Sequence, residues 1–389
     1  MKLVPLKDFC KMYQPPTIST KEMIPDGEFV VYGANGPIGR YNKFNHEESQ
    51  LLITCRGATC GAVNMSEPFA WINGNAMVIQ PDLKLATLEY MKYAFLGGID
   101  VSSAITGSAQ PQITRTTLEV IKVPLPSVEQ QLEIVEKLDS AFTEIDLLET
   151  NLGKSDEKAN QLLQSLLSSA FTSSVSTKEP SNSAANPGLA MKNMKIGEVV
   201  DLFNGSTPLK TNKDYWINGD IPWFTVEDLR KQGKFITYTE KFITKLGLKE
   251  SSISLIPENA VLLCCTASVG AIAINKIRLT TNQQFNALVV KDTKKLLVEY
   301  LYYWFLSNMD LLKSLGRATT IDYVSMTKLR DMNFQLPSLE KQRDIVEKLD
   351  SSFAEIDLLK AQIKIKKDYA TALRQSLLRS AFTQEEAIA

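Results

Sequence analysis

Two long stretches of the chain show a helical pattern of apolar and polar positions. In residues 125–172 apolar side chains recur every three or four positions, and the same spacing returns in residues 336–383. Such a stripe, held over several heptads, predicts a long helix with a coiled-coil seam. The first stripe comprises Val135, Leu138, Phe142, Ile145, Leu148, Leu152, Ala159, Leu162 and Leu166, and the second Val346, Leu349, Phe353, Ile356, Leu359, Ile363, Ala370, Leu373 and Leu377.

The two stretches are copies of one another. They align without gaps, so that residues 134–140 (IVEKLDS) recur as 345–351 and residues 144–148 (EIDLL) as 355–359. Each copy follows a Leu-Pro-Ser sequence, which supplies a break and a helix N-cap. Gly153 is the position at which an interruption of the first helix is expected. Repetition of this quality indicates a duplicated structural unit.

The two stripes have two possible partners. Each helix can pair with the other in an antiparallel intramolecular coiled coil, or each can pack against its own globular domain. The first stretch has nine acidic and three basic side chains, whereas the second carries Lys364, Lys366 and Lys367. This complementarity favours pairing of the helices or binding of a partner protein.

The segments before the helices are diverged copies too. Residues 51–63 and 261–272 are β-rich runs closed by a glycine turn, and a helical stretch follows in each segment, at 87–96 and 298–306. Short strands mixed with few helices predict α+β domains. We therefore expect domains at 1–124 and 191–335, long helices at 125–172 and 336–383, a flexible Ser-, Asn- and Pro-rich linker at 173–190, and a tail at 384–389.

Charge is distributed unevenly along the chain. The net charge is −1, but residues 125–172 carry a local charge of −6, and residues 191–335 carry 19 basic and 14 acidic side chains. A basic globular segment suits a polyanionic partner better than the total charge suggests. The start of the chain lacks the apolar core of a signal peptide, and no run is apolar enough to span a membrane. We expect a cytoplasmic protein.

The residues for several kinds of catalysis are missing from the sequence. His46 is the only histidine, and the five cysteines form no Cys-x-x-Cys pair. Neither Ser-His-Asp chemistry nor a zinc site is therefore expected. The sequence contains no Asn-Pro-Pro-Tyr loop, no Gly-rich cofactor turn and no Walker A motif. Carboxylate-only hydrolysis stays open, although no pair of acids stands out. We expect a non-catalytic protein without metal or cofactor.

This plan resembles that of the specificity (S) subunits of Type I restriction-modification enzymes. Residues 31–39 (VYGANGPIG) are similar to the family's YGANG turn, and residues 56–58 (RGA) and 107–113 are also similar to family motifs. The Leu-Pro-Ser-x-x-x-Gln sequence is repeated at 125–131 and 336–342. The second half departs from the pattern, since it has Asn-Gly-Ser-Thr-Pro at 204–208 instead of the YGANG turn.

The resemblance implies two pseudo-symmetric α+β target-recognition domains joined by two long helices that form an antiparallel coiled coil. In the family, each domain recognises one half of a split target in double-stranded DNA. The helices act as a spacer and dock two methyltransferase (M) subunits, which recruit restriction (R) subunits. Two unlike domains held at a fixed separation predict a bipartite, asymmetric target.

DNA recognition needs basic or amide side chains on exposed loops. The strongest candidates are the amides at 282–284 and at 110–112, because Asn and Gln can pair bidentately with adenine. For each candidate, a solvated or turn-stabilising role is the alternative. The candidates are Asn35, Arg40, Tyr41, Lys43, Arg56, Gln110, Gln112 and Arg115 in the first domain, and Lys210, Lys213, Ser268, Asn282, Gln283, Gln284, Arg317, Thr319 and Thr320 in the second.

Two other functions remain as alternatives. A coiled-coil adaptor whose globular domains bind protein predicts no salt-dependent affinity for DNA, whereas an S subunit predicts a steep fall with salt. A recognition subunit of a related methyltransferase-nuclease system would share the two-domain plan. Copurification distinguishes it, by showing whether an R-type ATPase joins the M subunit.

Overall fold

The computed structural model describes residues 2–97, 99–107, 110–172, 192–266, 270–316 and 324–383. It falls into two compact units. Unit 1 comprises Met1–Ser155 with Gln362–Ala389, and unit 2 comprises Asp156–Ala361. The long helices α3 (Val128–Thr172) and α10 (Leu339–Thr383) are each divided between the units. Each unit therefore contains one α+β domain, the start of the helix that follows it, and the end of the other long helix.

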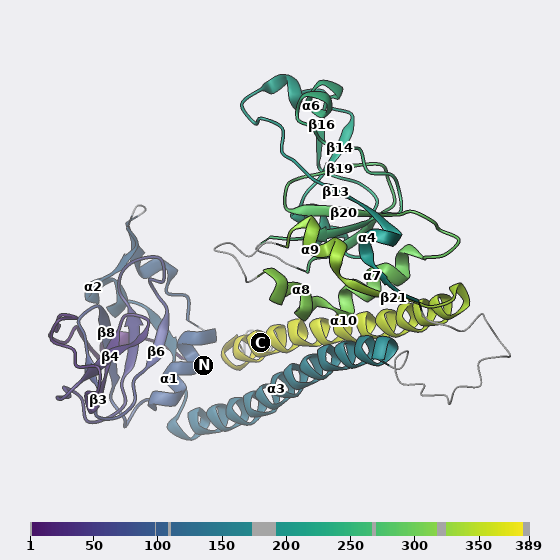
Figure 1. Cartoon of the computed structure of the whole chain (residues 1–389). Helices are drawn as coiled ribbons and strands as arrows, with labels where there is room; N and C mark the ends of the chain where they lie inside the picture. Colours follow the sequence, from purple (N-terminus) through teal and green to yellow (C-terminus); the bar gives the residue numbers. More distant parts are fainter. Residues whose placement is uncertain are drawn as a thin grey trace, which may run out of the picture. The chain divides into compact units, whose positions relative to one another are not determined.

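The α+β domain of unit 1 precedes α3 (Figure 1). Its strands form a four-stranded antiparallel sheet in the order β2-β8-β5-β6, a three-stranded sheet β4-β3-β7, and the pairs β1-β11 and β9-β10. Its elements are β1 (Leu3–Pro5), η1 (Leu6–Asp8), β2 (Cys10–Tyr13), β3 (Phe29–Gly33), β4 (Gly36–Tyr41), β5 (Leu51–Thr54), β6 (Val63–Met65), β7 (Trp71–Ile72), β8 (Ala76–Pro81), α1 (Leu88–Gly97), η2 (Ser102–Ala104), β9 (Ile105–Thr106), β10 (Gln112–Ile113), α2 (Arg115–Glu119) and β11 (Lys122–Pro124).

The domain of unit 2 repeats this plan with additions. Its sheets have the orders β13-β20-β17-β18-β15 and β16-β14-β19, and β12 pairs with β21. Its elements are β12 (Lys192–Lys195), α4 (Ile196–Val199), β13 (Val200–Asn204), η3 (Lys213–Tyr215), β14 (Ile221–Phe224), α5 (Val226–Gln232), β15 (Phe235–Ile236), β16 (Lys241–Ile243), α6 (Lys245–Glu250), β17 (Val261–Cys264), β18 (Ile272–Asn275), β19 (Thr280–Thr281), β20 (Phe285–Val290), α7 (Val298–Ser307), α8 (Met309–Gly316), α9 (Met326–Asp331) and β21 (Asn333–Leu336).

A fully buried central strand explains the apolar runs noted in both domains. Successive side chains of a strand point to opposite faces of the sheet, so a strand covered on both faces is apolar throughout. On β5, Leu51 and Ile53 face the core beneath α1, whereas Leu52 packs with the residues of the smaller sheet. On β17, Leu263 and Leu262 divide in the same way between two cores.

Each long helix begins with a buried glutamine that binds the adjoining domain. Gln131 and Gln342 are both 0% exposed. The Gln131 Oε1 accepts a hydrogen bond from the Thr87 N–H (2.9 Å), and its Nε2 donates to the carbonyls of Leu85 (2.8 Å) and Pro126 (3.0 Å). Gln342 makes the same three bonds in unit 2, to Leu297, Lys295 and Pro337. The repeated Leu-Pro-Ser-x-x-x-Gln sequence is thus a structural clamp.

The long helices pair in both units, and they run antiparallel. In unit 1, Arg374 of α10 forms an ion pair with Asp146 of α3. In unit 2, Lys360 of α10 donates to Asn160 of α3 (2.6 Å). The helices also pack on the domains: Phe382 lies against Tyr90 in unit 1, with ring centroids 5.5 Å apart. The α+β class and the paired helices are confirmed, and the two expected modes of packing occur together.

Two details of the helix prediction were wrong. Helix α3 continues through Gly153 without interruption, because a helix interior tolerates glycine at a modest cost. Leu148, Leu162 and Leu359 are 39%, 50% and 44% exposed, so they lie outside the seam. The division into residues 1–124, 125–172, 191–335 and 336–383 stays a prediction, and residues 173–190 and 384–389 lie outside the described residues.

Candidate nucleic-acid interface

Three predicted motifs of the first domain come together in unit 1. Ala34 and Asn35 form the tight turn of the β3–β4 hairpin, followed by Gly36 at a φ of 110°. The Asn35 Nδ2 donates to the Thr59 hydroxyl (2.7 Å), and its Oδ1 accepts from the Thr54 hydroxyl (2.9 Å). Asn35 is exposed, yet its amide fastens this turn to the loop that follows β5.

The loop after β5 also contacts strand β10. Arg56 forms an isolated β-bridge with Gln112, and the Gly57 N–H donates to the Pro111 carbonyl (3.1 Å). The side chains of Arg56, Gln110 and Gln112 are exposed. Arg115 begins α2 and is 68% exposed, although its Nε binds Glu119 (2.7 Å). We call Asn35, Arg56, Gln110, Gln112 and Arg115 the loop surface of unit 1. It offers cationic and amide groups on a framework held by backbone hydrogen bonds.

Arg40, Tyr41 and Lys43 lie at the other end of the β3–β4 hairpin, away from Asn35. The Arg40 guanidinium donates to the carbonyls of Gly27 (2.5 Å) and Glu28 (2.6 Å), which fix its position. The ring of Tyr41 packs edge-on against Trp71. These contacts favour the structural alternative for Arg40 and Tyr41. Lys43 is exposed.

In unit 2, the amide turn at 282–284 is built mostly by its own hydrogen bonds. Asn282 is only 8% exposed. Its Oδ1 accepts from the Gln284 N–H (3.0 Å), and its Nδ2 donates to the Gln284 Oε1 (3.1 Å). Gln283 is exposed and accepts a hydrogen bond from Thr207. Asn282 therefore stabilises the turn, and Gln283 and Gln284 are the amides within reach of a ligand.

A cavity of about 430 Å³ lies beside this turn, within unit 2. Sequence reasoning found Lys210, Asn282 and Gln284 but missed the rest of the lining. Two of the chain's four tryptophans fall at 216 and 223, which was the available signal. We call it the Trp216–Trp223 cavity, and its lining comprises Lys210, Trp216, Trp223, Thr225, Val226, Glu227, Lys241, Asn282 and Gln284.

Strand pairing corrects one predicted equivalence between the domains. Strand β3 pairs with β7 in parallel, and β14 pairs with β19 in the same way. The Asn73 N–H donates to the Tyr32 carbonyl and the Asn282 N–H to the Phe224 carbonyl, so Tyr32 corresponds to Phe224. The counterpart of the YGANG turn is therefore the start of α5, not residues 204–208, which begin at the last residue of β13. Lys213 is exposed in η3. Ser268, Arg317, Thr319 and Thr320 lie outside the described residues.

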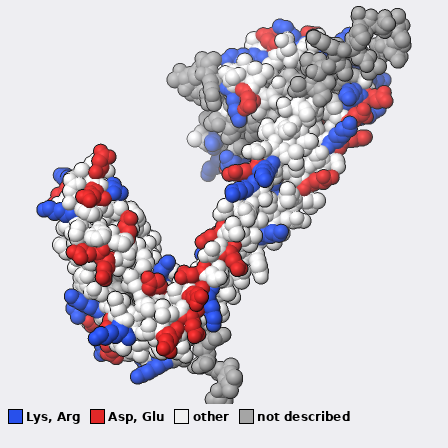
Figure 2. All heavy atoms as spheres, turned by 90° about the horizontal axis from the view of Figure 1, so that it is seen from below, with Lys and Arg blue, Asp and Glu red and all other residues white. Residues whose placement is uncertain are grey.

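Acidic side chains are interspersed with Lys and Arg along the long helices in Figure 2, but on α3 nine acidic side chains outnumber three basic ones. On α3, Glu133, Glu136 and Glu144 are exposed and line a shared hollow within unit 1. A polyanion is repelled by such a surface. DNA contact is therefore better suited to the loops of the domains than to this side of α3.

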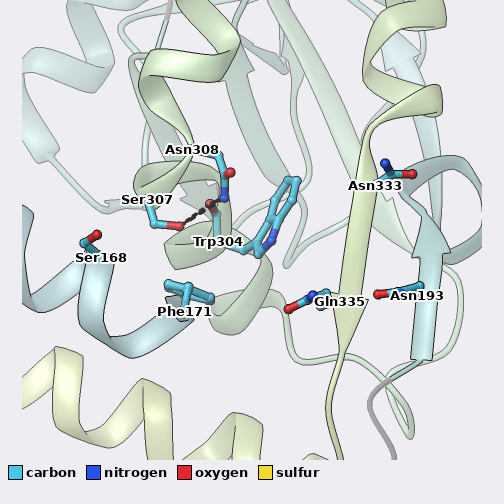
Figure 3. A pocket seen from close by; sticks show the side chains of 8 residues that line it. All are labelled: Ser168, Phe171, Asn193, Trp304, Ser307, Asn308, Asn333 and Gln335. Atoms are coloured by element: carbon cyan, nitrogen blue, oxygen red, sulfur yellow. Dashed lines mark hydrogen bonds between the residues drawn. The ribbon is translucent and has the colours of Figure 1, made fainter. Parts of the chain in front are cut away.

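A second cavity in unit 2, of about 630 Å³, lies between α7, the end of α3 and the β12–β21 pair (Figure 3). Every residue of its lining is uncharged. Trp304 and Ser307 line it, where unit 1 has Ala94 and Gly97 at the corresponding positions of α1. The two units therefore differ in the side chains that α1 and α7 place beside the paired long helices. The remaining lining residues are Ser168, Phe171, Asn193, Asn308, Asn333 and Gln335.

The titratable groups of the described residues give little sign of catalysis. No group of three His, Cys, Asp or Glu side chains among them is arranged to hold a metal ion. Burial raises the pKa of Cys55 to about 11 and that of Cys265 to about 12, so both thiols stay protonated at neutral pH. In the part of the chain that is described, helices suited to crossing a bilayer are absent.

Fold and surface together define a duplicated α+β protein with paired helices and unlike loops on two related domains. Residues 1–154 and 189–367 match the family of the Type I restriction modification DNA specificity domain. The chain belongs to this family.

Known relatives are specificity subunits. The Type I restriction enzyme MjaIX specificity subunit of Methanocaldococcus jannaschii is 36% identical over 154 residues, 39% of this chain and 35% of that protein. The StySPI specificity subunit of Salmonella potsdam is 23% identical over 385 residues, 95% of this chain and 76% of that protein. The match to the MjaIX subunit thus spans only about a third of that protein.

A solved structure has the same fold. It is described as the structural basis of complex assembly and conformational transition of the type I R-M system. Its matching chain gives a TM-score of 0.73 at 19% sequence identity, and the match covers 98% of this chain and 97% of that one. This agreement extends the similarity over nearly the whole fold.

Proposed function

We propose that this protein is the DNA-recognition subunit of a Type I restriction-modification complex. Each domain recognises one half of a bipartite, asymmetric target in double-stranded DNA. The paired helices dock two methyltransferase subunits, through which restriction subunits join, and the length of the helices sets the spacing of the two halves. Catalysis belongs to the partner subunits, and the complex acts in the cytoplasm.

One observation carries the proposal: the scaffold is duplicated while the loops are not. The buried glutamine clamp recurs bond for bond at the start of α3 and α10. At equivalent positions beyond β3 and β14, however, unit 1 has a hairpin turn and unit 2 has helix α5. Two copies of one framework with different loops suit the recognition of two different sequences.

The exposed surface of the long helices supports the docking of protein, and the acidic α3 disfavours DNA there. Exposed leucines recur at the same places in both copies, with Leu147 61% and Leu358 66% exposed. The sequence Glu-Ile-Asp-Leu-Leu surrounds both leucines, and such a shared surface on the two helices would accept two copies of one partner. Acidic side chains around them match a partner with basic side chains.

Binding measurements test the proposal. The protein, purified with its M subunits, is titrated against duplexes selected from a random pool, at salt concentrations from about 50 to about 200 mM. We expect one split, asymmetric motif, with an affinity that falls steeply as salt rises because basic residues displace counterions. Salt-independent binding, or selection of no motif, would contradict the proposal. Copurification of an ATPase with the M subunits separates a Type I complex from a related methyltransferase-nuclease system.

A further inference from the structure

The Trp216–Trp223 cavity presents mainly hydrogen-bond donors. The Asn282 Oδ1 is identified as oxygen because it accepts from a backbone N–H, that of Gln284 (3.0 Å). The Asn282 amide nitrogen then donates to the Gln284 Oε1 (3.1 Å), which identifies that atom as oxygen too. One lone pair of the Gln284 carbonyl is therefore used by Asn282, and the NH₂ group, with two donors, remains for a ligand.

Two cations line the same cavity. Lys210 and Lys241 have only donors at their ammonium groups. The one carboxylate in the lining, Glu227, lies 4.0 Å from the Lys241 Nζ, so its charge is partly balanced. The Thr225 hydroxyl donates its only proton to Asp228 (2.9 Å), so the donors that remain in the cavity include the two ammonium groups and the Gln284 NH₂ group. The cavity thus suits a ligand that offers acceptors.

The walls of the cavity are rigid. The rings of Trp216 and Trp223 meet edge to face, with centroids 5.0 Å apart at 87°. The Trp223 Nε1 donates to the Ser206 carbonyl (3.1 Å) and the Trp216 Nε1 to the Leu209 carbonyl (3.2 Å). Both indole N–H groups are therefore satisfied, and the rings contribute apolar surface. Apolar walls beside fixed polar groups are typical of a specific recognition site.

We infer that this cavity recognises a guanine of the DNA target through the O6 and N7 atoms of its major-groove edge. The inference rests on the proposed function. Guanine presents two acceptors there, whereas adenine presents an acceptor and a donor, and cytosine presents a donor. Bidentate pairing of Gln284 with adenine, which we expected from the sequence, would have to share the carbonyl that already accepts from Asn282, whereas guanine needs only the NH₂ group and the two cations.

Modified bases test this contact directly. Each guanine in the selected motif is replaced in turn by 7-deazaguanine, which lacks the N7 acceptor, or by hypoxanthine, which keeps N7 and O6 but lacks the minor-groove amino group. At one guanine, the first replacement should weaken binding roughly tenfold or more, and the second should leave it nearly unchanged. A motif in which no guanine responds in this way would overturn the inference.

A substitution assigns that guanine to this cavity. Gln284→Glu keeps an oxygen to accept from Asn282 but replaces the donor by an acceptor. We expect the preferred base at that position to change from guanine to cytosine, with the other half-site unaltered. Gln80→Glu adds the same charge at an exposed position of β8 and should leave the motif as it is. An unchanged motif for Gln284→Glu, or a uniform loss of affinity over all sequences, would indicate a phosphate contact and overturn the inference.

Two further results distinguish a failure of this inference from a failure of the proposed function or of folding. If the wild-type protein selects no motif, the proposed function fails, whatever the cavity does. If Gln284→Glu melts at a much lower temperature than the wild type, Lys210→Met replaces it. A weaker preference for guanine at that same position then supports the inference, and an unchanged preference overturns it.

Discussion

Individual side chains explain why the repeated helix sequence is so similar in its two copies. Gln131 satisfies one backbone donor and two backbone carbonyls at the junction of domain and helix, and Gln342 does the same in unit 2. A buried polar group without a partner is costly. An aliphatic side chain at either position would leave three backbone groups unsatisfied.

The first prediction follows from this clamp. Gln131→Leu should lower the free energy of unfolding of unit 1 by roughly 2–4 kcal/mol, because it removes three buried hydrogen bonds. Urea denaturation followed by far-ultraviolet circular dichroism measures the change. Gln164→Leu, at an exposed position of α3, is the control and should change stability by less than about 0.5 kcal/mol. Equal effects of the two substitutions would contradict the claim that the buried hydrogen bonds of Gln131 stabilise unit 1.

The only histidine is a second residue with a measurable consequence. The Asn45 Oδ1 accepts from the Ile72 N–H (2.8 Å), so it also accepts from the His46 Nδ1 (2.7 Å). The His46 Nε2 then accepts from the Tyr13 hydroxyl (2.9 Å). Burial lowers the pKa of His46 below its ordinary value of 6.5. The folded protein therefore favours the neutral imidazole.

The sign of the pH dependence follows. The pKa of His46 is lower in the folded protein than in the unfolded chain. The contribution of neutral His46 to stability is therefore complete above about pH 6.5, and it is lost as the pH falls through the folded pKa. The melting temperature of the wild type should fall more between about pH 7.5 and about pH 5.5 than that of His46→Gln. Parallel curves for the two proteins would show that His46 does not contribute.

At the scale of elements, two glycines on helices have opposite surroundings. A Cβ on Gly97, at the end of α1, would lie 2.4 Å from the Leu378 Cβ of α10. Gly153, inside α3, has open space where its Cβ would be. Gly97 thus permits close packing between α1 and α10, whereas Gly153 has no such role.

Alanine at these positions should change stability in opposite directions. Gly97→Ala should destabilise unit 1 by roughly 1–3 kcal/mol through overpacking. Gly153→Ala should stabilise the protein by about 0.5–1 kcal/mol, because alanine favours the helix. Thermal denaturation of both variants measures this. A gain in stability for Gly97→Ala would contradict close packing between α1 and α10 at this position.

The elements that the sequence predicted well are those whose signal is local. The 3-4 stripe and the gap-free repeat predicted both long helices, and Gly153 was the only misplaced break. The exposed Leu148, Leu162 and Leu359 were misassigned because a stripe of this period drifts around a straight helix. Each helix also changes its neighbours along its length, packing on a domain as well as on the other helix.

The candidate site was less predictable because its contacts join distant residues. The carbonyls that hold Arg40 come from Gly27 and Glu28, in the loop before strand β3. Asn282 is buried through pairing with Phe224, nearly sixty residues earlier. The composition of a loop shows that an amide is present, but only strand pairing shows whether the amide is free.

At the scale of the whole molecule, the sequence predicted the duplication and the family, since both depend on the order of motifs along the chain. The family match, the shared clamp and the unlike loops all support the proposed recognition of two different sequences. The target itself depends on side-chain geometry in the loops, which periodicity does not encode.

Methylation sequencing tests the central claim most directly. A host that expresses this protein with its M subunits is compared with a host that expresses the M subunits alone. The account predicts methylated adenines in one motif of two unlike halves, separated by a fixed number of unspecified base pairs, only when this protein is present. A continuous or palindromic motif, or the same methylation in both hosts, would contradict it.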